Sequence, residues 1–243
     1  MLIYIAVYMA QKERITKVLF SVIEEYVKTG QPVGSKTITD KYLKGVSPAT
    51  VRNILARLEY DGYLIQPHTS AGRIPTEKAY IFYISQATPN TAHSEGQKKF
   101  TNAVEQADSE ESAVKNVAKA LADFSNDMAL AVFDKNRSYY TGVSKLFGSL
   151  EENDIGFTRE LFELIDRFDE VIGEVFHDVP TTPRAFIGSE NPFGSSMSSI
   201  MVKYKLPNNT NIMLGIVGPM RMDYIKNVKL LFDAVESLKE IDK

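Results

Sequence analysis

The sequence contains no cysteine and has three histidines among its 243 residues. Without cysteine the chain can form neither a disulfide framework nor a thiolate metal site, which fits a reducing cytoplasm. His68, His93 and His177 are far apart in the sequence. A zinc enzyme is therefore not expected, and the sequence predicts no metal or other cofactor.

Nucleophile motifs, phosphate-binding loops and metal-ligand spacings are also missing from the sequence. Carboxylate pairs are present, such as Glu151 with Glu152 and Asp166 with Asp169 or Glu170. Their spacings are typical of solvated helix faces and turns. We therefore expect a protein that is not an enzyme.

A long hydrophobic run is missing as well. The apolar stretch Met1–Ala10 is ten residues long and lacks both a basic start and a cleavage site. It predicts neither a signal peptide nor a membrane span, so we expect a cytoplasmic protein with no membrane partner. Two interpretations of this stretch stay open: Met9 is the biological start and 1–8 an extension, or the stretch is a short edge strand.

Charge is distributed unevenly along the chain, although the net charge is only -3. Residues 11–83 carry eleven Lys and Arg against seven Asp and Glu, a net charge of +4, whereas residues 84–243 carry a net charge of -7. A basic segment joined to an acidic body suggests that the first segment faces phosphate and the second does not.

The first 85 residues predict a winged helix-turn-helix domain. Apolar residues at spacings of three and four indicate the first helix, which Gly30 and Pro32 end. Ser35 is expected to cap the second helix, Ser47 the third and Thr76 the fourth. The expected order is helices at 12–28, 35–42 and 48–59, a hairpin of 63–65 and 73–74, and a helix at 76–85.

The rest of the chain predicts a separate α+β domain. The polar residues 86–100 form the expected linker, and the domain covers 101–243. Alternating and helical patterns predict helices at 110–127, 157–177 and 221–240, and strands at 128–133, 184–188, 199–206 and 211–217.

The third helix has the composition of a DNA-recognition helix. Val51, Leu55 and neighbouring apolar residues form its buried stripe, which leaves the polar side chains outside. Arg52 and Asn53 can pair with guanine and adenine edges respectively, and Thr50 can contact a base methyl or a phosphate. A surface helix with two arginines is common in any protein, so the helix alone does not decide the class.

The loop after the third helix strengthens the prediction of DNA binding. Residues 66–73 are rich in small hydrogen-bond donors and end in Arg73, which is expected to lie along the phosphate backbone. His68 is equally compatible with a turn histidine bonded to the backbone. The residues predicted to contact DNA are Lys36, Thr37, Ser47, Ala49, Thr50, Arg52, Asn53, Arg57, His68, Thr69, Ser70, Gly72 and Arg73.

Four sequence runs carry a resemblance to a known family. They are EEYVKTGQPVGSKT at 24–37, VSPATVRN at 46–53, QPHTSAGRIPT at 66–76 and GIVGPMRMDY at 215–224. With these runs the chain resembles the HrcA family of heat-inducible transcription repressors. The resemblance is dense over 12–85.

The resemblance implies a repressor of chaperone operons that binds an inverted-repeat operator, the CIRCE element, as a homodimer. It also implies a winged-helix domain, a GAF-like domain, an inserted dimerising domain and modulation by the GroE chaperonin. This sequence departs from the family pattern because the insertion expected before Tyr139 is largely missing. Ile54 and Arg57 stand where acidic residues are expected, and Ala79 replaces a glycine. A dimer would then have to use the apolar residues of 157–177 or 221–240.

Two further classes and one weak site stay open. The chain could be a winged-helix regulator of another regulon with a metabolite-sensing C-terminal domain, or a winged-helix module for protein contacts. Arg52 and Arg57 disfavour the second, since such a module needs no exposed arginine there. Arg221, Asp223 and Tyr224 are candidates for a regulatory contact, although a turn and a helix start are the preferred interpretation.

Overall fold

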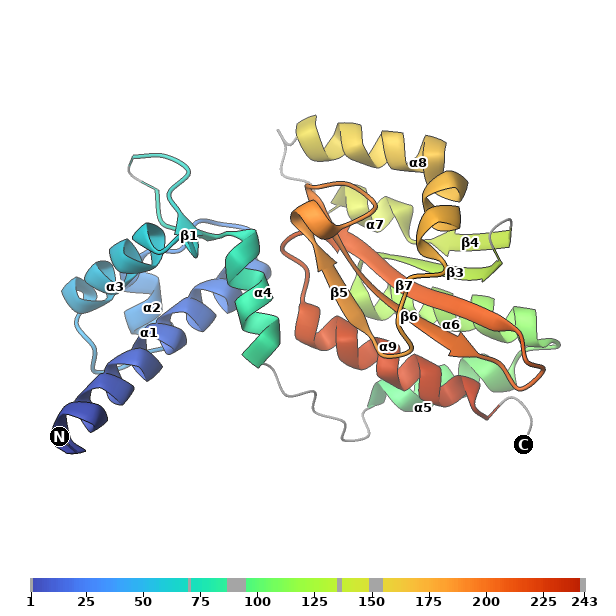
Figure 1. The fold of residues 1–243 in the computed structure, drawn as a ribbon, viewed down its shortest axis with the longest axis horizontal. Coiled ribbons are helices and arrows are strands. Elements are labelled where there is room, and N and C mark those ends of the chain that lie inside the picture. Colours follow the sequence, from blue (N-terminus) through green and yellow to red (C-terminus); the bar gives the residue numbers. More distant parts are fainter. Residues whose placement is uncertain (1, 70, 87–94, 135–136, 149–154, 241–243) are drawn as a thin grey trace. The chain divides into compact units, whose positions relative to one another are not determined.

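The computed structural model describes residues 2–69, 71–86, 95–134, 137–148 and 155–240 (Figure 1). The chain divides into two compact units, Met1–Ala87 and Thr88–Lys243. Within the described residues, none of the helices is both long enough and apolar enough to cross a membrane.

The first unit has the order of elements that the sequence predicted for a winged helix-turn-helix. Its helices bury a shared core in which Val22 and Ile23 of the first helix, Ile38 of the second and Leu55 of the third are almost fully shielded from solvent. The elements are α1 (Leu2–Thr29), α2 (Ser35–Lys41), α3 (Pro48–Tyr60), β1 (Leu64–Ile65), β2 (Ile74–Pro75) and α4 (Glu77–Gln86).

One predicted helix cap in the first unit is confirmed and another is not. Ser47 is the N-cap of α3 and accepts a hydrogen bond from the Thr50 amide at 3.1 Å, as the sequence predicted. The N-cap of α2 is Gly34, without a side-chain bond, so the predicted capping role of Ser35 is wrong. The first helix begins at Leu2, so the edge-strand interpretation of the first ten residues is also wrong.

The second unit is a five-stranded antiparallel sheet with helices on both faces, which confirms the mixed α+β class. The strand order is β4-β3-β7-β6-β5. Helices α5, α6 and α9 pack together on one face, and α8 covers the other (Figure 1). The elements are α5 (Glu95–Glu105), α6 (Glu110–Ser125), β3 (Met128–Asp134), β4 (Arg137–Thr141), α7 (Val143–Gly148), α8 (Ile155–Val175), β5 (Arg184–Ile187), η1 (Gly188–Glu190), β6 (Met197–Lys205), β7 (Asn211–Pro219) and α9 (Tyr224–Leu238).

The structure corrects one expectation about this unit and narrows another. The expected linker 86–100 is too long, because α5 begins at Glu95. The apolar residues of α8, such as Leu161 and Phe168, are buried against the sheet, and those of α9, such as Leu231, are buried in the same unit. Most apolar residues of the two helices are thus covered within the chain, but Phe162 of α8 is 54% exposed and Ile225 of α9 is 36% exposed. A dimer contact through these helices stays a prediction.

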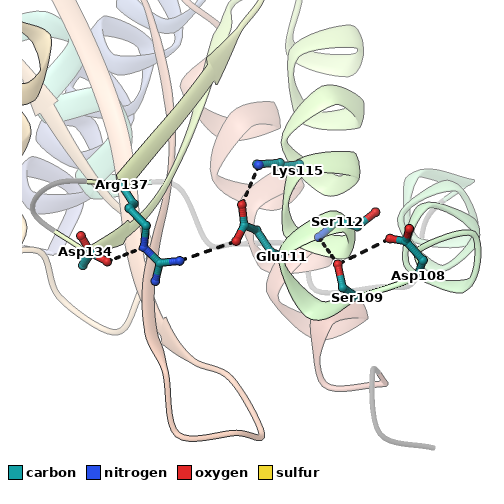
Figure 2. Close-up of polar contacts among 7 residues, drawn as sticks. All are labelled: Asp108, Ser109, Glu111, Ser112, Lys115, Asp134 and Arg137. Carbon is teal, nitrogen blue, oxygen red and sulfur yellow. Dashed lines mark hydrogen bonds and ion pairs between the residues drawn. The ribbon is translucent and has the colours of Figure 1, made fainter.

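Strands β3 and β4 follow each other directly at the place where the family resemblance implied an insertion. They pair in antiparallel register, with Asp134 opposite Arg137. An exposed network ties this hairpin to the start of α6: Arg137 contacts Asp134 at 2.6 Å and Glu111 at 3.6 Å, and Glu111 contacts Lys115 at 2.6 Å (Figure 2). Exposed pairs of this kind contribute little to stability individually.

A buried polar pair links the start of β3 to α9. Asp127 is almost fully buried, and its Oδ2 accepts a hydrogen bond from Asn227 Nδ2 at 3.0 Å. Burial raises the pKa of Asp127 to about 6, although Asn227, Lys226 and Arg221 favour the charged form. The charged carboxylate is therefore a destabilising element of this unit at neutral pH.

Replacing Asp127 by asparagine should stabilise the second unit at pH 7.5. Because the folded-state pKa lies above the unfolded value of 3.8, the folded protein binds more protons between pH 4 and 6, and stability falls as the pH rises through this window. We expect D127N to raise the free energy of unfolding by about 1–3 kcal/mol at pH 7.5, with a smaller gain at pH 5. Denaturant unfolding at both pH values measures this, and a loss of stability at pH 7.5 would contradict it.

Candidate nucleic-acid interface

One face of α3 is open to solvent along the whole helix. Val51, Leu55 and Leu58 are buried, so the opposite side chains point outward. The exposed face recurs at spacings of three and four residues and consists of Ala49, Arg52, Asn53, Ala56, Arg57 and Tyr60. It presents the guanidinium groups of Arg52 and Arg57 and the carboxamide of Asn53. The small residues of this face are Ala49 and Ala56, and its C-terminal end carries the large side chain of Tyr60.

The start of α3 combines a capped terminus with exposed hydroxyl groups. The Ser47 and Thr50 hydroxyls are 2.9 Å apart, and Ser47 also caps the helix. Ser47 and Ala49 are exposed, and Thr50 is half-buried. The Ser47 hydroxyl is therefore engaged in holding the helix start, and the Ser47 carbonyl accepts a second hydrogen bond from the Val51 amide.

Helix α2 is held in place by a buried carboxylate. Glu25 of α1 is 6% exposed, contacts Lys41 Nζ at 2.5 Å and accepts a hydrogen bond from the Tyr42 hydroxyl at 2.9 Å. The hydrogen bond from Lys41 lowers the pKa of Glu25. Lys36 is exposed and Thr37 half-buried on the same short helix.

The loop between β1 and β2 is braced from within. The Gln66 side chain donates to the carbonyls of Thr69 and Ala71 at 2.9 and 3.0 Å, and the Ala71 amide donates to the His68 carbonyl at 2.9 Å. The side chains of His68 and Thr69 are exposed. Ser70, also predicted to contact DNA, lies outside the described residues.

The root of this loop packs on the turn between α1 and α2. Arg73 forms an antiparallel bridge with Val33, with both backbone hydrogen bonds at 2.9 Å. A Cβ atom on Gly72 would lie 2.5 Å from the Val33 carbonyl carbon and 2.7 Å from that of Pro32. Glycine at 72 is therefore explained by close backbone packing, independently of any contact with DNA.

Two arginines predicted to contact DNA have acidic partners. Arg73 is bonded to Glu59 at 2.8 Å. Arg57 lies 3.7 Å from Asp61 on the same end of α3, in an exposed pair. Arg52 is exposed. Its side chain takes part in neither of these two ion pairs.

The candidate regulatory residues of the second unit have structural roles. Asp223 is the N-cap of α9 and accepts from the Lys226 amide at 3.1 Å. Tyr224 is 1% exposed, and its hydroxyl lies 2.7 Å from the Met220 carbonyl oxygen and 2.7 Å from the Ser198 hydroxyl. Arg221 is half-buried and lies near Asp127, whose charge it favours. These contacts support the preferred interpretation of a turn and a helix start.

Sequence reasoning missed three residues of this surface. Ala56 and Tyr60 continue the series from Arg52 and Asn53 by steps of three and four, so the helical period could have found them. Tyr60 is 92% exposed, which is unusual for a large aromatic side chain. Glu59 is bonded to a residue fourteen positions away, and no sequence pattern indicates that pairing.

The fold and this surface define a two-unit α+β protein whose N-terminal unit presents one helix and a braced hairpin loop to solvent. The family model described as the HrcA protein C-terminal domain matches residues 75–228. The chain belongs to the HrcA family.

Curated relatives support this assignment. A heat-inducible transcription repressor HrcA of Geobacter sulfurreducens is 30% identical over 233 residues, which cover 91% of this chain and 60% of the relative. That of Thermoanaerobacter sp. (strain X514) is 42% identical over 51% of this chain and 36% of the relative. The chain thus spans less than two thirds of the length of these relatives.

A solved structure described as a hypothetical protein has the same fold. It is 18% identical, with a TM-score of 0.72, and the match covers 94% of this chain and 97% of that one. At this level of identity the likeness concerns the fold alone.

The close packing at Gly72 generates a stability prediction. Gly72→Ser should destabilise the first unit by about 1–3 kcal/mol, because the new Cβ would overlap backbone atoms that cannot move aside cheaply. Gly34→Ser is the matched control, because a Cβ at Gly34 meets nothing within 4 Å and serine is a favourable N-cap. Thermal unfolding of both variants measures the difference. Equal stability of the two variants would contradict the packing role.

Proposed function

We propose that the chain is a transcriptional repressor of heat-shock operons that reads operator DNA with the exposed face of α3. The observation that carries the proposal is that face, which places Arg52, Asn53 and Arg57 outward on a helix whose other side is fully packed. Membership of the HrcA family supports the class of regulon, because the relatives carry the name heat-inducible transcription repressor.

In this proposal α3 enters the major groove as the recognition helix of a winged-helix domain. Arg52 can donate two hydrogen bonds to guanine O6 and N7, and Asn53 can pair with adenine N6 and N7. Ala49 and Ala56 flank them with methyl groups, which allows the helix backbone to approach the base edges.

Contacts to the phosphate backbone come from the edges of the same surface. Lys36 and Thr37 lie on α2, and His68 and Thr69 lie on the hairpin loop. Such contacts fix the register of the protein on the duplex without reading sequence. The net charge of +4 over residues 11–83 favours the approach of this unit to DNA.

The operator is proposed to be an inverted repeat of the CIRCE type, bound by a homodimer in the cytoplasm, in association with the nucleoid. A single recognition helix covers a small site, and a two-fold dimer doubles it with matching symmetry. Relief of repression by heat and modulation by the GroE chaperonin are proposed on the strength of family membership.

Operator selection tests the function most directly. The full chain is incubated with random duplex DNA, and bound sequences are recovered over several rounds. We expect an inverted repeat with two equal half-sites. An unrelated sequence would indicate a regulator of another regulon, and no enrichment over the starting pool would contradict DNA reading altogether.

Arg52 should determine the identity of one base pair in each half-site. Arg52→Ala is expected to cost about 1–3 kcal/mol on the selected operator and to relax discrimination at that position, with little change on unrelated DNA. Lys36→Ala is the control, because loss of a phosphate contact weakens binding to all sequences alike. Titrations against single-base operator variants measure both. An equal loss on all sequences for Arg52→Ala would make it a phosphate contact.

The homodimer should exist before DNA is bound. Sedimentation velocity over a range of micromolar concentrations is expected to show a species of twice the mass of the 27.2 kDa chain. A monomer at every concentration would leave pairing on DNA as the origin of a two-fold operator.

A further inference from the structure

Arg73 and Glu59 form a close, directed ion pair between the hairpin root and the end of α3. Arg73 Nε and Nη2 both lie 2.8 Å from Glu59 Oε2. The Arg73 side chain is 19% exposed and that of Glu59 is 35% exposed. The guanidinium is thus largely covered, and it is both hydrogen-bonded through Nε and ion-paired with the carboxylate.

The backbone of Arg73 is fixed on its other side. Its amide and carbonyl pair with Val33, and Gly72 packs against the Pro32–Val33 backbone with no space for a side chain. Arg73 therefore joins three segments of the first unit: the turn before α2, the hairpin and the last turn of α3.

We propose that Arg73 and Glu59 are positioning residues, which set the hairpin loop at a fixed place relative to the reading face of α3. The proposal rests on the proposed DNA-binding function and deepens it, because it assigns how two parts of one interface keep their spacing. It replaces the prediction that Arg73 contacts phosphate.

The geometry separates positioning from a phosphate contact. A guanidinium that donates a hydrogen bond to a carboxylate through Nε, with Nη2 also 2.8 Å from the same oxygen, has its charge offset locally, so it would displace few counterions from DNA. The pair instead joins residues fourteen positions apart, which holds the hairpin in its bound orientation before DNA arrives. Pre-organisation of this kind reduces the ordering cost of binding.

Glu59→Gln gives the sharpest test, because the two accounts predict opposite signs. If Arg73 contacts phosphate, removing the acid frees the arginine and removes a negative charge near DNA, so affinity should rise. If the pair positions the hairpin, operator affinity should fall, by about 3- to 10-fold for a partly exposed pair.

The remaining variants complete a double-mutant cycle. Arg73→Gln should weaken operator binding to a similar extent, and the double variant should be no weaker than either single variant. The dependence of affinity on salt should keep its slope in all three, whereas loss of a phosphate contact would reduce the slope by about one unit. Arg73→Lys should recover part of the affinity if it keeps the pairing.

Asp61→Asn is the matched control. It removes the same charge from the same end of α3, and it breaks the Arg57 contact without touching the hairpin. Its operator affinity should stay the same or rise slightly. Thermal unfolding of each variant shows that the folded fraction is complete at the assay temperature, and Glu59→Gln keeps the test usable where Arg73→Gln does not fold.

The outcomes distinguish this inference from the proposed function. Absence of an operator complex with the unmodified chain would overturn the proposed function. A normal complex that Glu59→Gln leaves unchanged or tightens, or a salt slope that Arg73→Gln reduces by about one unit, would overturn the positioning role alone.

Discussion

The packing of α3 against the rest of the first unit is the constraint on which the candidate interface depends. Val51, Leu55 and Leu58 occupy one side of the helix and are almost fully buried. Burial of three such side chains is worth several kcal/mol, so the rotation of the helix about its axis is fixed by its core face. The fixed rotation turns the opposite face of the helix toward solvent. The side chains of that face are not needed for packing and can serve recognition.

The hairpin depends on the same packed unit through polar and backbone contacts. The bridge between Val33 and Arg73, the close approach at Gly72 and the pair with Glu59 all act at the loop root. Gln66 adds support inside the loop. Contacts within the protein thus hold the loop both at its root and in its interior. The outward-facing side chains of the loop remain available for contact with DNA.

Much of the helical framework could be predicted from the sequence, because its signals are local. Ser47 followed by Pro48 marks the start of α3, and the apolar period of α8 identifies its buried side. Strand β4 was missed, since its residues are half-exposed at the sheet edge and lack a clear alternation. The extent of α1 was missed because its first residues show no amphipathic period.

The decisive polar contacts could not be predicted, because they join residues that are distant in sequence. Asp127 and Asn227 are one hundred positions apart, and their pairing exists only once the sheet and α9 have formed. In the sequence, Arg73 ends a loop of small, polar residues, and this pattern predicts a phosphate contact. The structure instead places Glu59 beside it. The family resemblance pointed to this surface by motif but gave no geometry for it.

Site-directed photocrosslinking tests the central claim, that the outer face of α3 meets DNA, most directly. Because the chain has no cysteine, a single cysteine carries a photoreactive label without background. Ala56→Cys places the label at the middle of that face, and Ile81→Cys places it on an exposed position of α4. The account predicts crosslinks to operator DNA from position 56 and few from position 81. Efficient crosslinking from 81 with none from 56 would contradict it.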